Sequence, residues 1–120
     1  MIADDDPFFV QMLQAQLAGC EQLEVVGTAA NGAEAINLVE LLEPAVVLMD
    51  VGMPVLDGVN AMRAIRNMEH PPAVVVVTGR EDEVSAHSAY QEGAQAYLRK
   101  SEDLPLLIGV VVAVSQLAAA

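Results

Sequence analysis

Short runs of apolar, β-branched residues alternate with longer amphipathic stretches along the whole chain. This alternation constrains the fold more than any other feature of the sequence. The runs are Met1–Ala3, Glu24–Thr28, Ala45–Met49, Ala73–Val77 and Ala96–Leu98. Continuous apolar runs of this length are typical of strands that are covered on both faces, as in parallel sheets. The run at Met1 is short, and we expect a few residues to precede it in the complete strand.

The stretches between these runs have the spacing of helices. Phe9, Leu13 and Leu17 recur at four-residue spacing, and so they share one face of a helix. Before them stand Asp6 and Pro7, which are residue types favoured at an N-cap and at the first helical position. The predicted helices are Pro7–Leu17, Asn31–Leu42, Gly58–Met68, Glu81–Glu92 and Leu104–Ala118.

Strict alternation of strands and helices predicts an α/β protein with the order (βα)5. Right-handed crossovers then give a doubly wound, five-stranded parallel sheet with helices on both of its faces. The 120 residues have the size of one domain, residues 1–120, and we expect no output domain within them. A hydrophobic content of 54% is enough for a core and argues against disorder.

Charge and composition exclude several classes of partner. A formal net charge of −12 repels phosphate backbones, which disfavours direct nucleic-acid contact by this domain. Cys20 is the only cysteine, so no internal disulfide forms, as in a reducing cytoplasm. The longest apolar stretch, Leu104–Val114, is too short to span a bilayer, and no signal peptide is apparent. We therefore expect a cytoplasmic location and no membrane partner, and His70 and His87 match no metal-ligand spacing.

Polar side chains follow the apolar runs where the predicted strands end. These residues are Asp4 and Asp5 after the first run, Asp50 after the third, Thr78 after the fourth and Lys100 after the fifth. Ligands of doubly wound sheets bind at the carboxyl ends of the strands, so we expect these side chains to converge. Capping occupies Asp6 and leaves Asp4 and Asp5 without that role. Carboxylates gathered at one point resist ionisation together, and a magnesium ion would relieve their repulsion.

Each of these residues is compatible with a purely structural role when it is considered alone. Lys100, the only lysine of the chain, would form an ion pair with the acids or would bind a phosphoryl oxygen. Thr78 would satisfy loop backbone or would supply a hydroxyl group to the same site. An acid pair, a lone aspartate, a hydroxyl and an ammonium on four strand ends together indicate a functional site.

Four motifs carry a resemblance to a known family. They are Ile2–Pro7, Met49–Gly58, Val77–Gly79 and Gly93–Lys100, of which the stretch around Asp50 is the most specific. With these motifs and their spacing the sequence resembles the response-regulator receiver family of two-component signalling over essentially the whole chain. The resemblance implies a flavodoxin-like sheet with the strand order 2-1-3-4-5.

The resemblance implies that Asp50 accepts a phosphoryl group as a carboxylate nucleophile. Asp5, Asp50 and the backbone carbonyl of Gly52 would bind Mg²⁺ directly, and Asp4 would bind it through water. The phosphoryl donor would be the phosphohistidine of a sensor histidine kinase or of a phosphotransfer protein. The chain would be a self-phosphorylating and self-dephosphorylating switch rather than a turnover enzyme.

The resemblance also assigns the residues that respond to phosphorylation. Lys100 and Thr78 would bind phosphoryl oxygens, and Tyr97 would move inward as Thr78 moves toward the phosphate. Pro54 and Gly58 would shape the loop after Asp50. Such a change at a bistable site would alter the face formed by the fourth helix, fifth strand and fifth helix.

Two departures from the family pattern bear on the output. Ser101 follows the lysine where many receivers have proline, which looks most like receivers attached to helix-turn-helix transcription factors. Val10 stands where that subgroup often has arginine.

The final helix carries no charge and is apolar nearly all round, so we expect it to join a homodimer or an output domain.

Two other functions compete with this interpretation. A phosphatase of the haloacid dehalogenase type needs a second acid two residues after its nucleophile, and that position is Gly52. A pseudo-receiver would act as an interaction module without phosphorylation, although the complete residue set argues against it.

Arg80 lies close enough to Thr78 in sequence to reach over the pocket and influence dephosphorylation.

Overall fold

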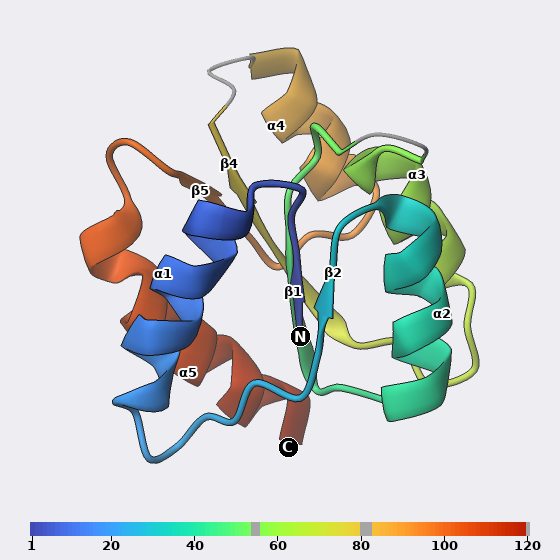
Figure 1. The fold of residues 1–120 in the computed structure, drawn as a ribbon. Helices are drawn as coiled ribbons and strands as arrows, with labels where there is room; N and C mark the ends of the chain where they lie inside the picture. Colours follow the sequence, from blue (N-terminus) through green and yellow to red (C-terminus); the bar gives the residue numbers. More distant parts are fainter. Residues whose placement is uncertain (54–55, 80–82, 120) are drawn as a thin grey trace.

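The computed structural model describes residues 1–53, 56–79 and 83–119, in which strands and helices alternate (Figure 1). The strands are β1 (Ile2–Ala3), β2 (Thr28–Ala29), β3 (Val46–Met49), β4 (Ala73–Thr78) and β5 (Ala96–Arg99). The helices are α1 (Pro7–Ala18), α2 (Gly32–Leu42), α3 (Gly58–Arg66), α4 (Glu83–Gln91) and α5 (Leu107–Ala119). A short 3-10 helix, η1 (Leu104–Leu106), precedes α5. The predicted (βα)5 order is confirmed.

All strand pairs of the sheet are parallel, and the strand order is β2-β1-β3-β4-β5. This is the order that the resemblance implied. The valine-rich β4 pairs with both β3 and β5 and is buried from Val74 to Thr78. A strand whose one polar side chain is Thr78, at its end, suits this position, because helices cover both faces of the sheet there.

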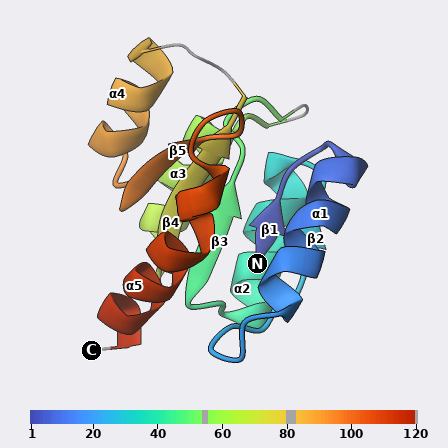
Figure 2. The same ribbon diagram turned by 90° about the vertical axis from the view of Figure 1, so that its left-hand side faces the viewer.

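Alternating strand residues divide the core into two layers. Met49 and Val76 lie in the layer that includes buried residues of α2 and α3. Leu48 and Val75 lie in the layer that includes buried residues of α1 and α5. Figure 1 shows α1 and α5 on one side of the sheet and α2 and α3 on the other, and Figure 2 looks onto the first of these sides.

The helix starts are set by the residues that precede them. Asp6 caps α1 by accepting hydrogen bonds from the amides of Phe8 and Phe9, at 3.0 and 3.4 Å, and Pro7 occupies the first position. The capping role predicted for Asp6 is therefore confirmed. Asn31 caps α2 in the same way, since its side-chain oxygen accepts a hydrogen bond from the amide of Glu34 at 2.9 Å.

The second strand differs from the prediction, which placed it at Glu24–Thr28. The structure has only Thr28–Ala29 as β2, because β1 offers only Ile2 and Ala3 as pairing partners. Apolar character alone made the preceding residues resemble a strand. They lie outside the ladder, although the carbonyl of Gly27 accepts a hydrogen bond from the amide of Ile2 at 3.1 Å.

The last helix also begins later than predicted, because residues 104–106 form η1 before α5 starts at Leu107. Asp103 stands at the cap position of η1 but makes no side-chain capping bond. Its carboxylate instead accepts a hydrogen bond from the amide of Arg99 at 2.8 Å, at the end of β5. A tighter turn therefore connects β5 to the α-helix.

The third helix, predicted at Gly58–Met68, is also shorter than predicted and ends at Arg66.

Helix α5 buries more of its apolar surface than the sequence suggested. Leu107, Val111 and Val114 are buried, and Ile108, Val110 and Val112 are half-buried. The exposed positions from Leu107 to Leu117 are Gly109, Ala113, Gln116 and Leu117. The outer side of α5 between residues 107 and 117 thus has two small residues, one polar side chain and one large apolar side chain, Leu117, which is 73% exposed. None of the described helices is long and apolar enough to cross a membrane.

Candidate functional site

The carboxyl ends of four strands meet at one edge of the sheet and bring the predicted site residues together. Asp4 follows β1, Asp50 follows β3, Thr78 ends β4 and Lys100 follows β5. Ladder hydrogen bonds fix these positions directly: the amide of Asp50 donates to the carbonyl of Ala3, and that of Lys100 donates to Thr78, both at 2.9 Å. The strand register therefore determines how the site is assembled.

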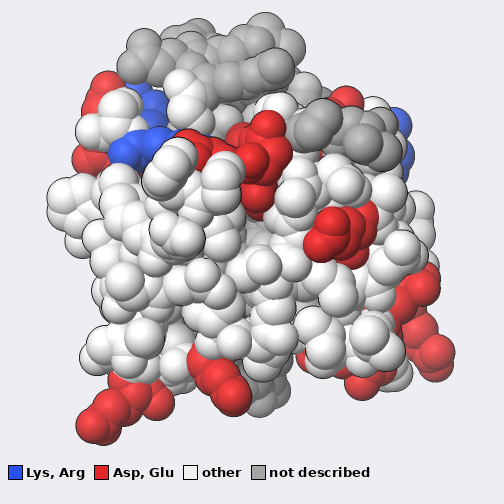
Figure 3. Space-filling model, viewed as in Figure 1, with Lys and Arg blue, Asp and Glu red and all other residues white. Residues whose placement is uncertain are grey.

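Asp4, Asp5 and Asp50 form a cluster of carboxylates, which we call the acid cluster. One ligand oxygen from each lies within 4.8 Å of the others. Asp4 and Asp50 are buried and Asp5 is exposed. Figure 3 shows an acidic surface over the end of β1, with basic surface beside it. Several carboxylate oxygens in this arrangement are the type of ligand set that hard divalent cations prefer.

Lys100 reaches into the acid cluster. Its Nζ atom lies 2.6 Å from Asp4 Oδ2 and 3.7 Å from Asp50 Oδ2. Burial raises the pKa of the Asp4 carboxyl, and the hydrogen bond from Lys100 opposes that rise. The negative charge of Asp50 raises the pKa of Asp4 further. Lys100 therefore provides part of the positive charge that a buried pair of carboxylates needs.

The two oxygens of the Asp50 carboxylate have different surroundings. Oδ1 accepts hydrogen bonds from the amide of Gly52 at 3.0 Å and from the hydroxyl of Thr78 at 3.2 Å. Oδ2 faces the ammonium of Lys100. Thr78 is fully buried, so its hydroxyl group is held at the end of β4. One oxygen is therefore fixed in place and the other lies next to a cation, which is an arrangement suited to a nucleophile.

Not every predicted residue lies in the acid cluster. Gly52 is exposed and contributes its amide to Asp50. Tyr97 is half-buried and packs against the core layer of α2 and α3, with its ring centroid 6.3 Å from that of Tyr90 on α4. Pro54 and Arg80 lie outside the described residues.

Sequence reasoning missed one neighbour of the acid cluster. Phe9 was assigned to the core face of α1, and it does pack there. The centroid of its ring also lies 4.1 Å from Lys100 Nζ. No spacing along the chain marked this contact, because it depends on how the first turn of α1 packs near the end of β5.

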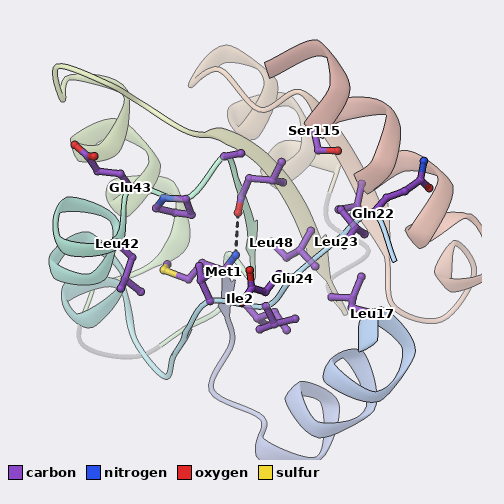
Figure 4. A pocket seen from close by; sticks show the side chains of 16 residues that line it. Met1, Ile2, Leu17, Gln22, Leu23, Glu24, Leu42, Glu43, Leu48 and Ser115 are labelled. Carbon is purple, nitrogen blue, oxygen red and sulfur yellow. Dashed lines mark hydrogen bonds between the residues drawn. The ribbon is translucent and has the colours of Figure 1, made fainter. Parts of the chain in front are cut away.

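A cavity of about 300 Å³ lies at the opposite end of the sheet (Figure 4). Its walls are mostly apolar and include Ile2, Leu17 and Val111. Met1 and Val46 both line the cavity, and the amino group of Met1 donates a hydrogen bond to the carbonyl of Val46 at 2.9 Å. Within the described part of the chain, the acid cluster is the one group of acidic, histidine or cysteine side chains arranged to hold a metal ion. We therefore place the candidate site at the acid cluster rather than in this cavity.

Comparison with known proteins gives consistent matches. Residues 1–112 match the model of the response regulator receiver domain. A protein-glutamate methylesterase/protein-glutamine glutaminase of Methanosarcina acetivorans is 37% identical over 103 residues, which cover 85% of this chain and 30% of that protein. The transcriptional regulatory protein LnrK of Bacillus subtilis is 34% identical over 114 residues, which cover 95% of this chain and 52% of that protein.

Solved structures show the same architecture. A two-component response regulator of the LuxR family from Aurantimonas superposes with a TM-score of 0.90 at 28% identity, covering 97% of this chain and 83% of that chain. The response regulator domain of Thermotoga maritima CheB gives a TM-score of 0.86 at 25% identity, covering 99% and 94%. Against the curated relatives, by contrast, the chain spans 30% of the methylesterase and 52% of LnrK.

Proposed function

Because the chain belongs to the response regulator receiver domain family, we propose that it is a phosphoacceptor switch with Asp50 as the acceptor. The observation that carries this proposal is the convergence of the acid cluster, Thr78 and Lys100 on adjacent strand ends. The donor is the phosphohistidine of a sensor histidine kinase or of a phosphotransfer protein. The carboxylate of Asp50 attacks phosphorus, the P–N bond to the histidine breaks, and an acyl phosphate forms.

We assign the attack to Oδ2 of Asp50. Oδ1 already accepts two hydrogen bonds, whereas Oδ2 lies 3.7 Å from the Lys100 ammonium, which would meet the phosphoryl oxygens. The hydroxyl of Thr78, which donates a hydrogen bond to Asp50, would then donate it to a phosphoryl oxygen instead. A transferring phosphoryl group carries its charge on its equatorial oxygens, so these groups stabilise the transition state mainly by position and charge.

The acid cluster fits a magnesium ion, because three carboxylates offer oxygens within 4.8 Å of one another. Asp5, Asp50 and the backbone carbonyl of Gly52 would hold the ion directly, and Asp4 would hold it through water. Bound magnesium would neutralise charge on the phosphoryl oxygens. Lys100 would then be released from its contact with Asp4.

Beryllofluoride binding tests the proposal against the alternative of a phosphorylation-independent pseudo-receiver. Beryllofluoride imitates a phosphoryl group on an aspartate, so the chain should bind it in the presence of magnesium and not without magnesium. Isothermal titration calorimetry measures both conditions. A chain that stays unbound with magnesium present would support the pseudo-receiver.

Magnesium is expected to raise the melting temperature, because it relieves repulsion within the acid cluster. At about 100 times its dissociation constant, the ion would add about 2.7 kcal/mol to the free energy of unfolding. Asp5→Ala should lose most of this gain, and Asp57→Ala, outside the acid cluster, should keep it. Differential scanning calorimetry with and without magnesium measures the effect, and a parent protein indifferent to magnesium would count against the metal site.

The stabilisation of the fold by magnesium should depend on pH in a defined direction. The folded-state pKa of Asp4 is raised, so its contribution to stability is present at low pH and is lost as pH rises through that pKa. A protonated Asp4 is also a poor partner for a cation. The stabilisation by magnesium should therefore grow as pH rises through the raised pKa.

We propose that α5 provides the contact with a second copy of the chain or with an output domain. Leu117 is 73% exposed on this helix, and Leu106 just before it is 60% exposed. Phosphorylation would change Thr78 and Tyr97 and thereby the adjoining surface of α4, β5 and α5. If the output is transcriptional, as Ser101 suggested, this surface would control it.

For α5, light scattering should give the mass of a dimer when beryllofluoride and magnesium are present. Leu117→Glu should reduce dimerisation because it places a charge on the exposed apolar position. Gln116→Glu adds the same charge at the neighbouring exposed position and is the matched control. A monomer in every condition would remove support for the dimer.

A further inference from the structure

The ring of Phe9 covers the ammonium of Lys100. Lys100 Nζ lies 4.1 Å from the ring centroid, well inside the distance of about 6 Å at which a cation is attracted to an aromatic face. Phe9 is held in the first turn of α1, where its amide donates to the Asp6 cap at 3.4 Å. The start of α1 and the end of β5 therefore meet above the acid cluster.

Among the residues that the structure describes, the Lys100 ammonium contacts two carboxylates and one aromatic ring, and the two carboxylates are ligands of the proposed chemistry. Asp4 Oδ2, at 2.6 Å, would turn toward a bound cation. Asp50 Oδ2, at 3.7 Å, would carry the phosphoryl group. The ring of Phe9 is the neighbour that neither binds metal nor accepts phosphate. It can therefore stay on the ammonium before, during and after transfer.

We propose that Phe9 is a positioning residue that holds the Lys100 ammonium over the acid cluster through a cation–π contact. The proposal rests on the phosphoacceptor function of Asp50. When Asp4 turns to a bound cation, the ring remains as a second contact that keeps the ammonium near Asp50, from which it lies 3.7 Å. The ring thus limits the positions that a long, flexible side chain can adopt.

Phe9 also packs against the core layer of α1 and α5, so a purely apolar role must be separated from an aromatic one. Phe9→Leu keeps an apolar side chain but removes the ring. Phe9→Tyr keeps an aromatic face. Phe8 supplies a matched control, because it is the adjacent phenylalanine and is 80% exposed.

Nuclear magnetic resonance observes the contact directly. Lys100 is the only lysine, so lysine labelled with ¹³C at Cε gives a single side-chain signal. Protons above an aromatic face are shifted upfield, so the Cε protons should be upfield in the parent, in Phe9→Tyr and in Phe8→Leu. They should return to ordinary values in Phe9→Leu. An ordinary shift in the parent would overturn the contact, whatever the function of Asp50.

Beryllofluoride affinity in the presence of magnesium tests the consequence. Loss of a cation–π contact of ordinary strength should weaken binding by about three- to tenfold in Phe9→Leu. Phe9→Tyr should restore the parent affinity, and Phe8→Leu should not change it. Equal affinities in the parent and in Phe9→Leu would overturn the role of Phe9 and leave Asp50 as the acceptor. A parent that does not bind beryllofluoride would overturn the proposed function itself.

Discussion

Asp50→Asn is expected to abolish the alkali-labile labelling of the chain by radioactive acetyl phosphate. The amide of asparagine cannot form an acyl phosphate. Among the described residues, no other carboxylate has one oxygen fixed by Gly52 and Thr78 with the other beside Lys100. The expected loss is complete, within the background of the assay. Labelling is measured by gel electrophoresis with and without magnesium.

Asp57→Asn is the matched control for this change. Asp57 caps α3 through the amide of Asn60, and asparagine caps a helix equally well. It should label like the parent. A circular dichroism melt of Asp50→Asn shows whether the fold is retained. Labelling of Asp50→Asn at the level of the parent would show that the phosphoryl group is carried elsewhere.

Gly58→Ala is expected to destabilise the fold strongly. A Cβ atom at Gly58 would lie 2.4 Å from the backbone oxygen of Asp50 and 2.6 Å from Cα of Val51. The start of α3 thus rests on the backbone segment that carries the acceptor, and neither side of this contact is a flexible side chain. Overpacking of this kind costs about 3 kcal/mol of unfolding free energy, at the upper end of the usual range. Urea denaturation measures the loss.

Gly109→Ala is expected to stabilise the fold, as measured by the same urea denaturation. Gly109 is exposed within α5, and beyond its chain neighbours and the backbone of its own helix no described atom lies within 4 Å of a Cβ placed there. Alanine should therefore raise the unfolding free energy by about 0.5–1 kcal/mol through its higher helix propensity. If Gly58→Ala were as stable as Gly109→Ala, α3 would not be seated on the Asp50 backbone.

The sequence predicted the fold well, because valine-rich runs such as Ala73–Val77 are compatible with little else than a buried parallel strand. The sequence predicted the length of a strand less well where that length depends on the neighbouring strand. Residues 24–27 have the apolar character of a strand, yet β2 contains only Thr28 and Ala29, since its neighbour β1 offers two residues. No local pattern contains that information.

The convergence of the acid cluster was predictable for a topological reason. Parallel strands end at the same edge, so Asp4, Asp50 and Lys100 had to come together once their strands were identified. The partners of each side chain were not predictable. The contact of Lys100 with Phe9 depends on how α1 leans over the end of β5, which is a property of helix packing and not of spacing along the chain.

The tyrosine pair between α4 and β5 makes the molecule its own optical reporter. The chain has two tyrosines and no tryptophan, so Tyr90 and Tyr97 dominate its near-ultraviolet spectrum. Their ring centroids are 6.3 Å apart with a 46° angle between the rings, a separation at which two chromophores couple their transitions. Any rearrangement that moves one ring relative to the other therefore alters the near-ultraviolet circular dichroism. The state of this region can be followed in real time without an attached dye.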